Sequence, residues 1–319
     1  MKRFTAHVAS SLVLLFAVSI LSFALLELAP GDFFADLQTD TRVGPDTVET
    51  LRAQYGLRQS PVVRYWQWLR SVVRGDLGFS LTHRAPVSSV LWVRARNTLV
   101  LTVPAMLLTW SLALPLGIWM ARRRGHLVDR ACSVAASTLV ALPDLFVALL
   151  LLLVALRTGL FPTGGMFSPG VEELSIAARA RDLGLHMFLP LCAVVATMLP
   201  VVFRHVRASV IEAHAAPAVQ AARGHGISQS RLTLRYILPL AANPLISLAG
   251  LSVATLLSAS LLIEVVMSWP GLGPLLVEAL LAKDVHVVLS ASMLATTLLV
   301  SGNLLADVTL YAVDPRIRA

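Results

Sequence analysis

Six long apolar runs restrict what this chain can fold into. They cover residues 8–26, 99–121, 132–156, 187–203, 240–263 and 286–311. About 20 apolar residues in a helix cross the hydrocarbon of a bilayer, where no water is present to satisfy a strand edge or an irregular loop. The runs therefore predict an all-α membrane protein with six transmembrane helices.

The first run is expected to be a retained helix. It follows Lys2 and Arg3, and it is longer than the ~7–15 apolar residues of a cleavable signal peptide. Glu27 and Pro30 also interrupt the region where a small-residue cleavage site would lie. The run at 187–203 is the least regular, because it contains two prolines, which neighbouring groups can accommodate in a membrane helix.

Arginine placement predicts the orientation, because short cytoplasmic loops are enriched in basic residues. Both termini are expected in the cytoplasm, with the arginines of residues 122–130, 204–235 and 316–318. The loop at 29–98 is also rich in arginine, but loops beyond about 60 residues follow this rule poorly. The chain is therefore divided into residues 1–98, the first transmembrane helix with an extracytoplasmic loop, and residues 99–319, a transmembrane core.

The long loop itself contains two predicted helices, which begin at Pro45 and Pro61. The second carries Trp66 and Trp68 in an amphipathic pattern, and a glycine-rich turn follows at 74–80. Two interpretations stay open: a helix that lies on the membrane interface, or a small subdomain with an aromatic core.

Charge and motifs exclude several classes of protein. The net charge of +8 could indicate nucleic-acid binding, but the arginines flank apolar runs and no RNP, zinc or basic-helix pattern occurs. Cys132 and Cys192 lie in apolar runs, so we expect these two cysteines to pack as small hydrophobic residues and not to form a metal site. No HExxH, GxSxG or CxxC occurs, and neither lysine, Lys2 nor Lys283, follows a glycine as a P-loop requires. We expect no enzyme, and any ATPase must be a separate chain.

A polar segment at 207–239 separates the fourth and fifth apolar runs. A plain connection needs about 2–8 residues, so this segment is predicted to bind a soluble partner. Pro217 can begin a short helix, and Gly224 and Gly226 can end it in positive-φ conformations. Small side chains between them suit insertion into a groove of another protein. The alternative is a surface helix that packs on its own subunit.

Ionisable residues near the membrane offer a second class of function. His205, His214 and His225 do not share a helix face, so a solvated or interface role is expected. Carboxylates at the bilayer midplane would indicate an ion-coupled secondary transporter. The candidates are Asp144, Glu264 and Asp307, whereas Glu27 lies near the outer end of its helix. We favour charges that are bonded to a neighbouring helix or subunit, and keep ion coupling as the alternative.

The polar segment resembles the EAA-type coupling motif of ABC importer permeases, and its flanks resemble the oligopeptide/dipeptide/nickel branch of that family. The resemblance covers nearly the whole chain. It comprises LAPGD at 28–32, LRAQYGL at 51–57, GDLGFS at 75–80, RNTLVL at 96–101, LPDLF at 142–146, LFPTGG at 160–165, EVVMSWPGLG at 264–273 and DPRIR at 314–318.

This resemblance implies a type I ABC importer permease fold in a bacterial or archaeal cytoplasmic (inner) membrane. It implies three kinds of partner: a second, homologous permease, two ATPase subunits that bind ATP and Mg, and an extracytoplasmic solute-binding protein. No cofactor is expected on this chain itself. Peptides are the default cargo, while nickel chelates, glutathione-like molecules and opines use similar permeases.

Two groups of site residues follow from the resemblance. The expected contacts with the ATPase are Glu212, Pro217, Ala218, Ala221, Ala222, Arg223, Gly224, His225 and Gly226. The expected gate or docking surface for the binding protein is Glu264, Trp269, Pro270, Gly271, Gly273 and Asp284. The chain departs from the family at Pro217 and Ala218, where an acidic–aromatic pair is common, and at His225, where lysine is common.

Overall fold

The computed structural model describes every residue except 1, 32, 35–44, 55, 57 and 314–319. The terminal motif at 314–318 therefore lies outside the described residues, as do parts of the motifs at 28–32 and 51–57. The helices are α1 (Lys2–Leu28), α2 (Pro45–Gln54), α3 (Pro61–Val73), α4 (Val87–Arg122), α5 (Leu127–Ala141), α6 (Asp144–Thr158), α7 (Ile176–Ala215), α8 (Pro217–Gly224), α9 (Gln229–Leu232), α10 (Leu238–Val266), α11 (Leu272–Leu281) and α12 (Val285–Val313). A short hairpin of β1 (Phe79–Ser80) and β2 (Ala85–Pro86) precedes α4, and a π-helical stretch (Thr233–Ile237) joins α9 to α10.

The chain forms two compact units, residues 1–97 with 271–297 and residues 98–270 with 298–319. The first unit thus contains a segment, 271–297, that the sequence division at 98/99 places in the transmembrane core. The division at 98/99 stays a prediction of which residues lie outside the membrane and which form the transmembrane core. The two compact units instead describe which residues pack together.

In the first unit, α3 packs on α1 through an aromatic cluster. Phe23 of α1, Trp68 of α3 and Leu289 of α12 are buried together, and Tyr65 lies 2.8 Å from the hydroxyl of Ser19. Trp66 is exposed. Trp68 therefore belongs to an aromatic core, while Trp66 points to the surface; contact of α3 with the membrane interface stays a prediction.

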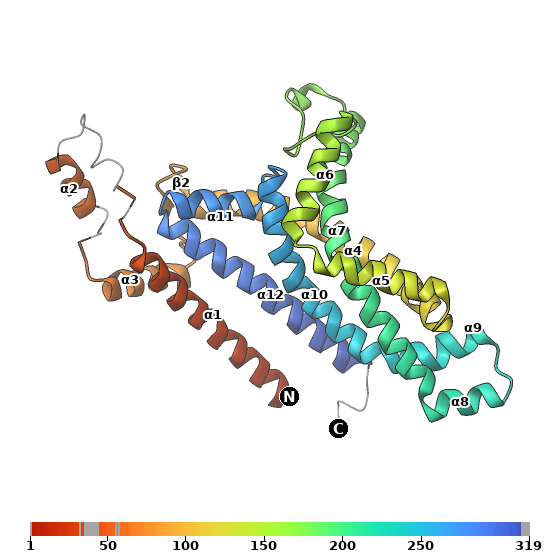
Figure 1. Cartoon of the computed structure of the whole chain (residues 1–319). Helices are drawn as coiled ribbons and strands as arrows, with labels where there is room; N and C mark the ends of the chain where they lie inside the picture. The colour runs from red at the N-terminus through yellow and green to blue at the C-terminus, as the bar shows by residue number, and fades with distance from the viewer. Residues whose placement is uncertain (1, 32, 35–44, 55, 57, 314–319) are drawn as a thin grey trace. The chain divides into compact units, whose positions relative to one another are not determined.

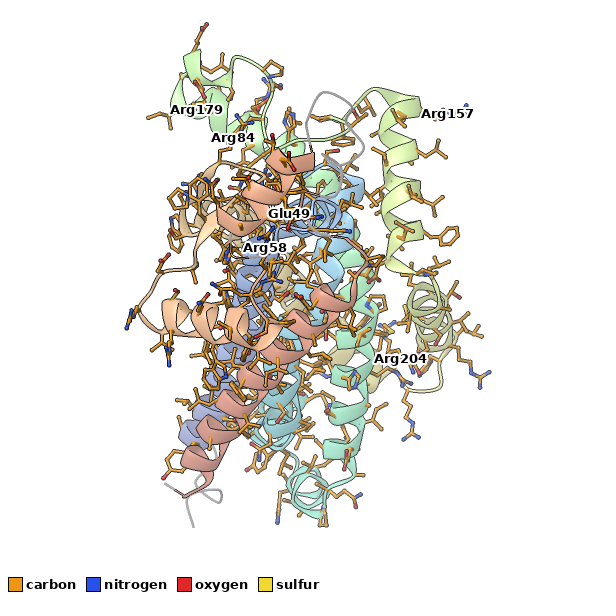
Figure 2. The ribbon with its side chains drawn as sticks, turned by 90° about the vertical axis from the view of Figure 1, so that its left-hand side faces the viewer. Glu49, Arg58, Arg84, Arg157, Arg179 and Arg204 are labelled. Carbon is orange, nitrogen blue, oxygen red and sulfur yellow. The ribbon has the colours of Figure 1, made fainter. Side chains whose placement is uncertain are left out.

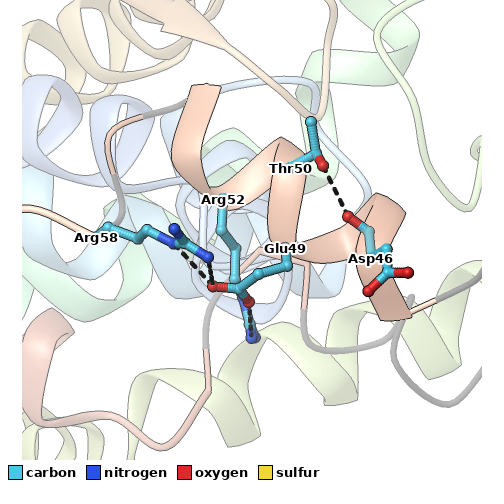
Figure 3. Close-up of polar contacts among 5 residues, drawn as sticks. All are labelled: Asp46, Glu49, Thr50, Arg52 and Arg58. Atoms are coloured by element: carbon cyan, nitrogen blue, oxygen red, sulfur yellow. Dashed lines mark hydrogen bonds and ion pairs between the residues drawn. The ribbon is translucent and has the colours of Figure 1, made fainter.

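Helix α2 is held at its end by charge pairs (Figure 3). Arg58 donates from Nε to Glu49 over 2.8 Å, and Arg52 lies 3.9 Å from the same carboxylate. Both predicted loop helices begin at the prolines expected of them, Pro45 and Pro61. Proline is favourable there because its missing N–H has no helical partner at that position.

In the second unit, α7 is the central helix (Figure 1). Its apolar residues enter two clusters, one with α8 and the start of α10, the other with α6 and the end of α10. Val206 and Val210 belong to the first cluster, and Ala193 and Val194 belong to the second. The part of α7 that carries the coupling segment is therefore built into the core of this unit.

Among the described residues, five helices are long and apolar enough to cross a membrane, and a bent pair of helices makes a sixth span if it is counted as one. The single helix predicted at 132–156 is wrong, because α5 and α6 meet there at 98°. Leu142 and Pro143 are both extended at the break. Proline disfavours the helical conformation of the residue before it and lacks the N–H that would continue α5.

Helices α10 and α12 approach each other through small residues. A Cβ added at Gly302 would lie 2.7 Å from the Cβ of Val253, and one added at Gly250 would overlap the Cβ of Ala306. Helices in membranes associate where small residues let their backbones come close. The small side chains at 250, 302 and 306 therefore set the distance between these two helices.

Replacing Gly250 by alanine is expected to lower the stability of the protein by about 1–3 kcal/mol, because the added methyl group has no space. The measurement is thermal unfolding of the detergent-purified protein. Gly184→Ala is the matched control: Gly184 is also helical, and nothing lies within 4 Å of its added Cβ. Equal unfolding temperatures for both variants would contradict the close approach.

Candidate functional site

The predicted polar segment begins inside α7. Residues 207–215 form the last turns of that helix, and Ala216 alone separates it from α8. Ala216 is extended because Pro217 follows it, and Pro217 takes the first position of α8 as predicted. Figure 1 shows α8 and α9 together beyond the end of α7.

The end of α8 differs from the prediction in one detail. Gly226 has φ +74 and turns the chain in a left-handed conformation, as expected. Gly224 is the last helical residue and His225 follows it with φ −78, so Gly224 does not supply a positive φ. One left-handed residue is enough to end the helix and redirect the chain.

Helix α8 has two different faces. Val219 is fully buried and Ala222 is 6% exposed, and both pack in the cluster that contains Val206 and Leu232. The opposite side is exposed and includes Pro217, Ala218, Gln220, Ala221 and Arg223. Ala222, predicted to contact a partner, is therefore turned toward its own chain. Helix α8 thus packs on its own subunit with one face and leaves the other face accessible. Packing on the subunit and binding of a partner therefore do not exclude each other.

The other predicted partner contacts are accessible. Glu212 is exposed on the last turns of α7, Gly224 is exposed at the end of α8, and His225 and Gly226 are exposed directly after it. Together with the open face of α8, the last three of these residues form one exposed surface that begins at Pro217. We call the exposed residues of 217–226 the coupling surface.

A buried ion pair anchors the chain before α8. Arg207 donates from Nε to Oδ1 of Asp129 over 2.6 Å and from Nη2 to Oδ2 over 2.8 Å. The N–H of Gly125 adds a third bond to Oδ2 at 3.0 Å. The Asp129 side chain is 3% exposed and that of Arg207 is 25% exposed. This bidentate geometry joins the start of α5 to α7.

A second bond anchors the chain after α8. Arg122, at the end of α4, donates from Nη2 to the hydroxyl of Thr233 over 2.6 Å, and that hydroxyl donates to the carbonyl of Gln229 over 2.9 Å. The coupling surface is thus tied on both sides to the turn between α4 and α5. Sequence reasoning missed Asp129 and Thr233. The available signal was an aspartate in the first turn of an otherwise apolar helix.

The residues predicted as a gate or docking surface lie mostly in the interior. Glu264 and Trp269 are fully buried, and the backbone N–H of Trp269 donates to the backbone carbonyl of Glu264 over 2.8 Å. Gly271 and Gly273 are also buried, and Pro270 is half-buried. Side chains that no solvent reaches do not form a docking surface in this conformation.

The backbone near Trp269 is strained and closely packed. Ser268 has φ +51, a left-handed conformation that is costly for a residue with a side chain. A Cβ added at Gly164 would lie 3.1 Å from the Met267 carbonyl oxygen and 3.1 Å from the Ser268 Cβ. The LFPTGG motif therefore packs against this segment by means of a glycine.

Asp284 is a buried structural carboxylate. It accepts from the Ser80 hydroxyl over 2.7 Å and from the Thr82 N–H over 3.1 Å, both with Oδ2. Its Oδ1 accepts from the N–H of Val287 at 3.4 Å and so caps α12. The carboxylate thereby fastens the β1–β2 turn to the start of α12.

The remaining ionisable groups in the described part of the chain do not assemble a metal site. Arg64 of α3 donates from Nη1 to both oxygens of Glu27, at 3.1 and 2.9 Å, which is the bond to a neighbouring helix that we favoured. Among the described residues, no group of three or more His, Cys, Asp or Glu side chains is placed to hold a metal ion.

Comparison with known proteins gives family matches along the whole chain. Residues 113–319 match the family described as "Binding-protein-dependent transport system inner membrane component", and residues 1–113 match the corresponding N-terminal family. The chain is 30% identical to the oligopeptide transport system permease protein AppB of Bacillus subtilis (strain 168), over 96% of each chain. It is also 30% identical to the dipeptide transport system permease protein DppB of Escherichia coli (strain K12), over 94% of each.

Two further similarities agree with these matches. The glutathione transport system permease protein GsiC of Escherichia coli is 30% identical over 95% of this chain and 94% of its own. A chain of the MetNI methionine ABC transporter, solved in inward-facing conformations, superposes with a TM-score of 0.58 at 17% identity. It covers 71% of this chain and 97% of its own, and it shows the fold alone.

Proposed function

This chain belongs to the family of binding-protein-dependent transport system inner membrane components, and we propose that it forms half of the translocation pathway of an importer for di- and oligopeptides. It is a multi-pass permease subunit of an ABC transporter and not an enzyme; separate subunits hydrolyse ATP. Relatives named for oligopeptides, dipeptides and glutathione support a peptide cargo.

The observation that carries this proposal is the coupling surface. Its helix α8 has a buried face that packs in the core of its own chain and an exposed face of small residues. The two anchors, at Asp129 and Thr233, tie it to the membrane helices, so force applied to α8 reaches α4, α5 and α7. In the proposed mechanism, closure of two ATPase subunits around ATP and Mg moves the permease helices as rigid bodies.

The complete assembly comprises, in our proposal, a second homologous permease, the two ATPases and an extracytoplasmic solute-binding protein. The complex lies in the cytoplasmic (inner) membrane of a bacterium, with both termini of this chain in the cytoplasm. The arginines at 122–124 and in the segment 204–235 support this orientation, because basic residues concentrate on the cytoplasmic side.

For the segment 264–273, a gate fits its surroundings better than a docking surface. Trp269 is enclosed, and the left-handed Ser268 stores strain where Gly164 approaches closely. Strained backbone of this kind costs about 1–3 kcal/mol and is often found at switch regions.

Crosslinking tests the coupling surface. In a variant without native cysteines (Cys132→Ser and Cys192→Ser), Ala221→Cys is expected to form a disulfide with a cysteine placed in the groove of the ATPase, because Ala221 is exposed. The readout is the crosslinked band on a non-reducing gel of the intact transporter.

Val219→Cys is the matched control from the same helix, and it is expected to stay uncrosslinked because Val219 is fully buried. If Ala221→Cys gave no crosslink in a complex that retains its ATPase, the coupling proposal would fail. A crosslink from both positions would show that α8 does not keep its buried face in the complex.

A further inference from the structure

A hollow of about 350 Å³ lies beside the coupling surface in the second unit. It is bordered by the end of α4, the end of α7, the last turn of α8 and the start of α9. Its lining consists of Ala121, Arg122, Arg124, Ile211, His214, Ala215, Arg223 and Gln229. The space is large enough for a phosphate group together with part of the molecule that carries it.

The charge around this hollow has one sign. Three of its lining residues are arginines, one is histidine, and none of the residues given for the lining is acidic. Asp129, the acidic residue that interacts electrostatically with Arg124, is already bound by Arg207 through two bonds. Three cations around one concave space raise the local concentration of anions, and arginine is the side chain best suited to bind phosphate.

The position of the hollow relative to the membrane follows from the end of α4. The Arg123 guanidinium lies 4.8 Å from the ring centroid of Trp119, and this tryptophan is 42% exposed. Tryptophan is enriched at the level of the lipid headgroups. The hollow adjoins this same end of α4, where basic pockets between membrane helices bind the headgroups of anionic lipids.

We propose that this hollow binds one phosphate group, supplied by an anionic phospholipid of the inner leaflet or by a soluble phosphate compound. Arg223 belongs to α8, whereas Arg122 and Arg124 belong to the turn after α4, so a bound phosphate bridges the coupling helix and the membrane helices. This bridge acts in addition to the two anchors at Asp129 and Thr233. Its effect on coupling and the inner-leaflet source rest on the proposed function, whereas the binding of a phosphate group in the hollow does not.

The test measures binding to the complete transporter purified in mild detergent. Native mass spectrometry records how much phosphatidylglycerol stays bound to the wild type and to the double variant Arg124→Gln with Arg223→Gln. Each arginine near an anionic headgroup contributes enough that removing two is expected to weaken binding about 10-fold or more. Arg122 is left intact because it bonds Thr233.

The matched control is Arg204→Gln with Arg235→Gln, which removes the same charge from exposed arginines outside the lining. Arg204 projects from α7 in Figure 2. This control is expected to retain phosphatidylglycerol like the wild type. Arg124→Gln alone, an exposed position in a turn, provides a smaller change if the double variant does not assemble.

A second experiment, a calorimetric titration, identifies the source of the phosphate. Inorganic phosphate is added to the transporter in neutral phosphatidylcholine nanodiscs, and its binding is measured by isothermal titration calorimetry. Binding of phosphatidylglycerol but not of free phosphate supports the lipid source, and the reverse supports a soluble compound. The site would be overturned if the wild type bound neither probe, or if the wild type, the variant and the control bound both probes equally. Because neither readout requires transport or ATP hydrolysis, such a failure is distinct from a failure of the coupling surface.

Discussion

Replacing Asp129 by alanine is expected to lower the free energy of unfolding by about 3–5 kcal/mol, because it leaves the charge of Arg207 without its buried partner. The carboxylate is almost completely buried and accepts three bonds, two from Arg207 and one from the backbone of Gly125. The measurement is thermal unfolding of the purified transporter, compared with the exposed variant Arg204→Gln, which should change little.

A charge swap separates the ion pair from simple loss of packing. Combining Asp129→Arg with Arg207→Asp is expected to recover part of the stability that either single change removes, because opposite charges again face each other. Replacing Asp129 removes the acceptor of the Gly125 N–H, so recovery in the double variant will be incomplete. If the double variant were as unstable as the sum of the single ones, the pair would not be an energetic link between α5 and α7.

Replacing Asp284 by alanine is expected to cost about 2–4 kcal/mol, because the change removes the cap of α12 and leaves the buried donors of Ser80 and Thr82 without an acceptor. Asp284→Asn keeps the shape and one carbonyl oxygen, and we expect it to cost less than half as much. Thermal unfolding again provides the measurement.

The same pair of variants distinguishes a structural carboxylate from a gate that depends on charge. Glu278→Gln serves as the control, since the Glu278 side chain is 49% exposed. A charge-dependent gate predicts that Asp284→Asn abolishes uptake without lowering the unfolding temperature. The buried, bonded position of Asp284 instead predicts a structural role. Uptake by the alanine and asparagine variants should then decline in step with their unfolding temperatures.

The buried position of Asp284 also shows why the resemblance assigned it a different role. A motif alignment gives the position of an aspartate along the chain, but it does not say which way the side chain points. Ser80 and Thr82 lie about 200 residues away in sequence, with separations of 204 and 202. No local pattern indicates that a serine in a short hairpin will supply the partner.

Local features were predictable because their causes are local. Pro217 begins α8, Pro61 begins α3, and Gly226 turns the chain after α8, all as expected from the conformations these residues favour. The break at Pro143 has the same kind of cause. It was nevertheless missed, because the continuous apolar character of 132–156 favoured a single span.

The sequence by itself determined that this chain is a helical membrane permease, and it predicts a partner-binding segment at 207–239. Apolar length, arginine placement, the missing P-loop and the ordered motifs are properties of the chain that do not depend on how helices pack. Only the tertiary structure decided that Val219 and Ala222 face inward while Ala221 faces outward, and that Asp129 meets Arg207 78 residues later. Which helices become neighbours follows from the sum of many weak contacts across the whole core, and no short stretch of sequence contains that information.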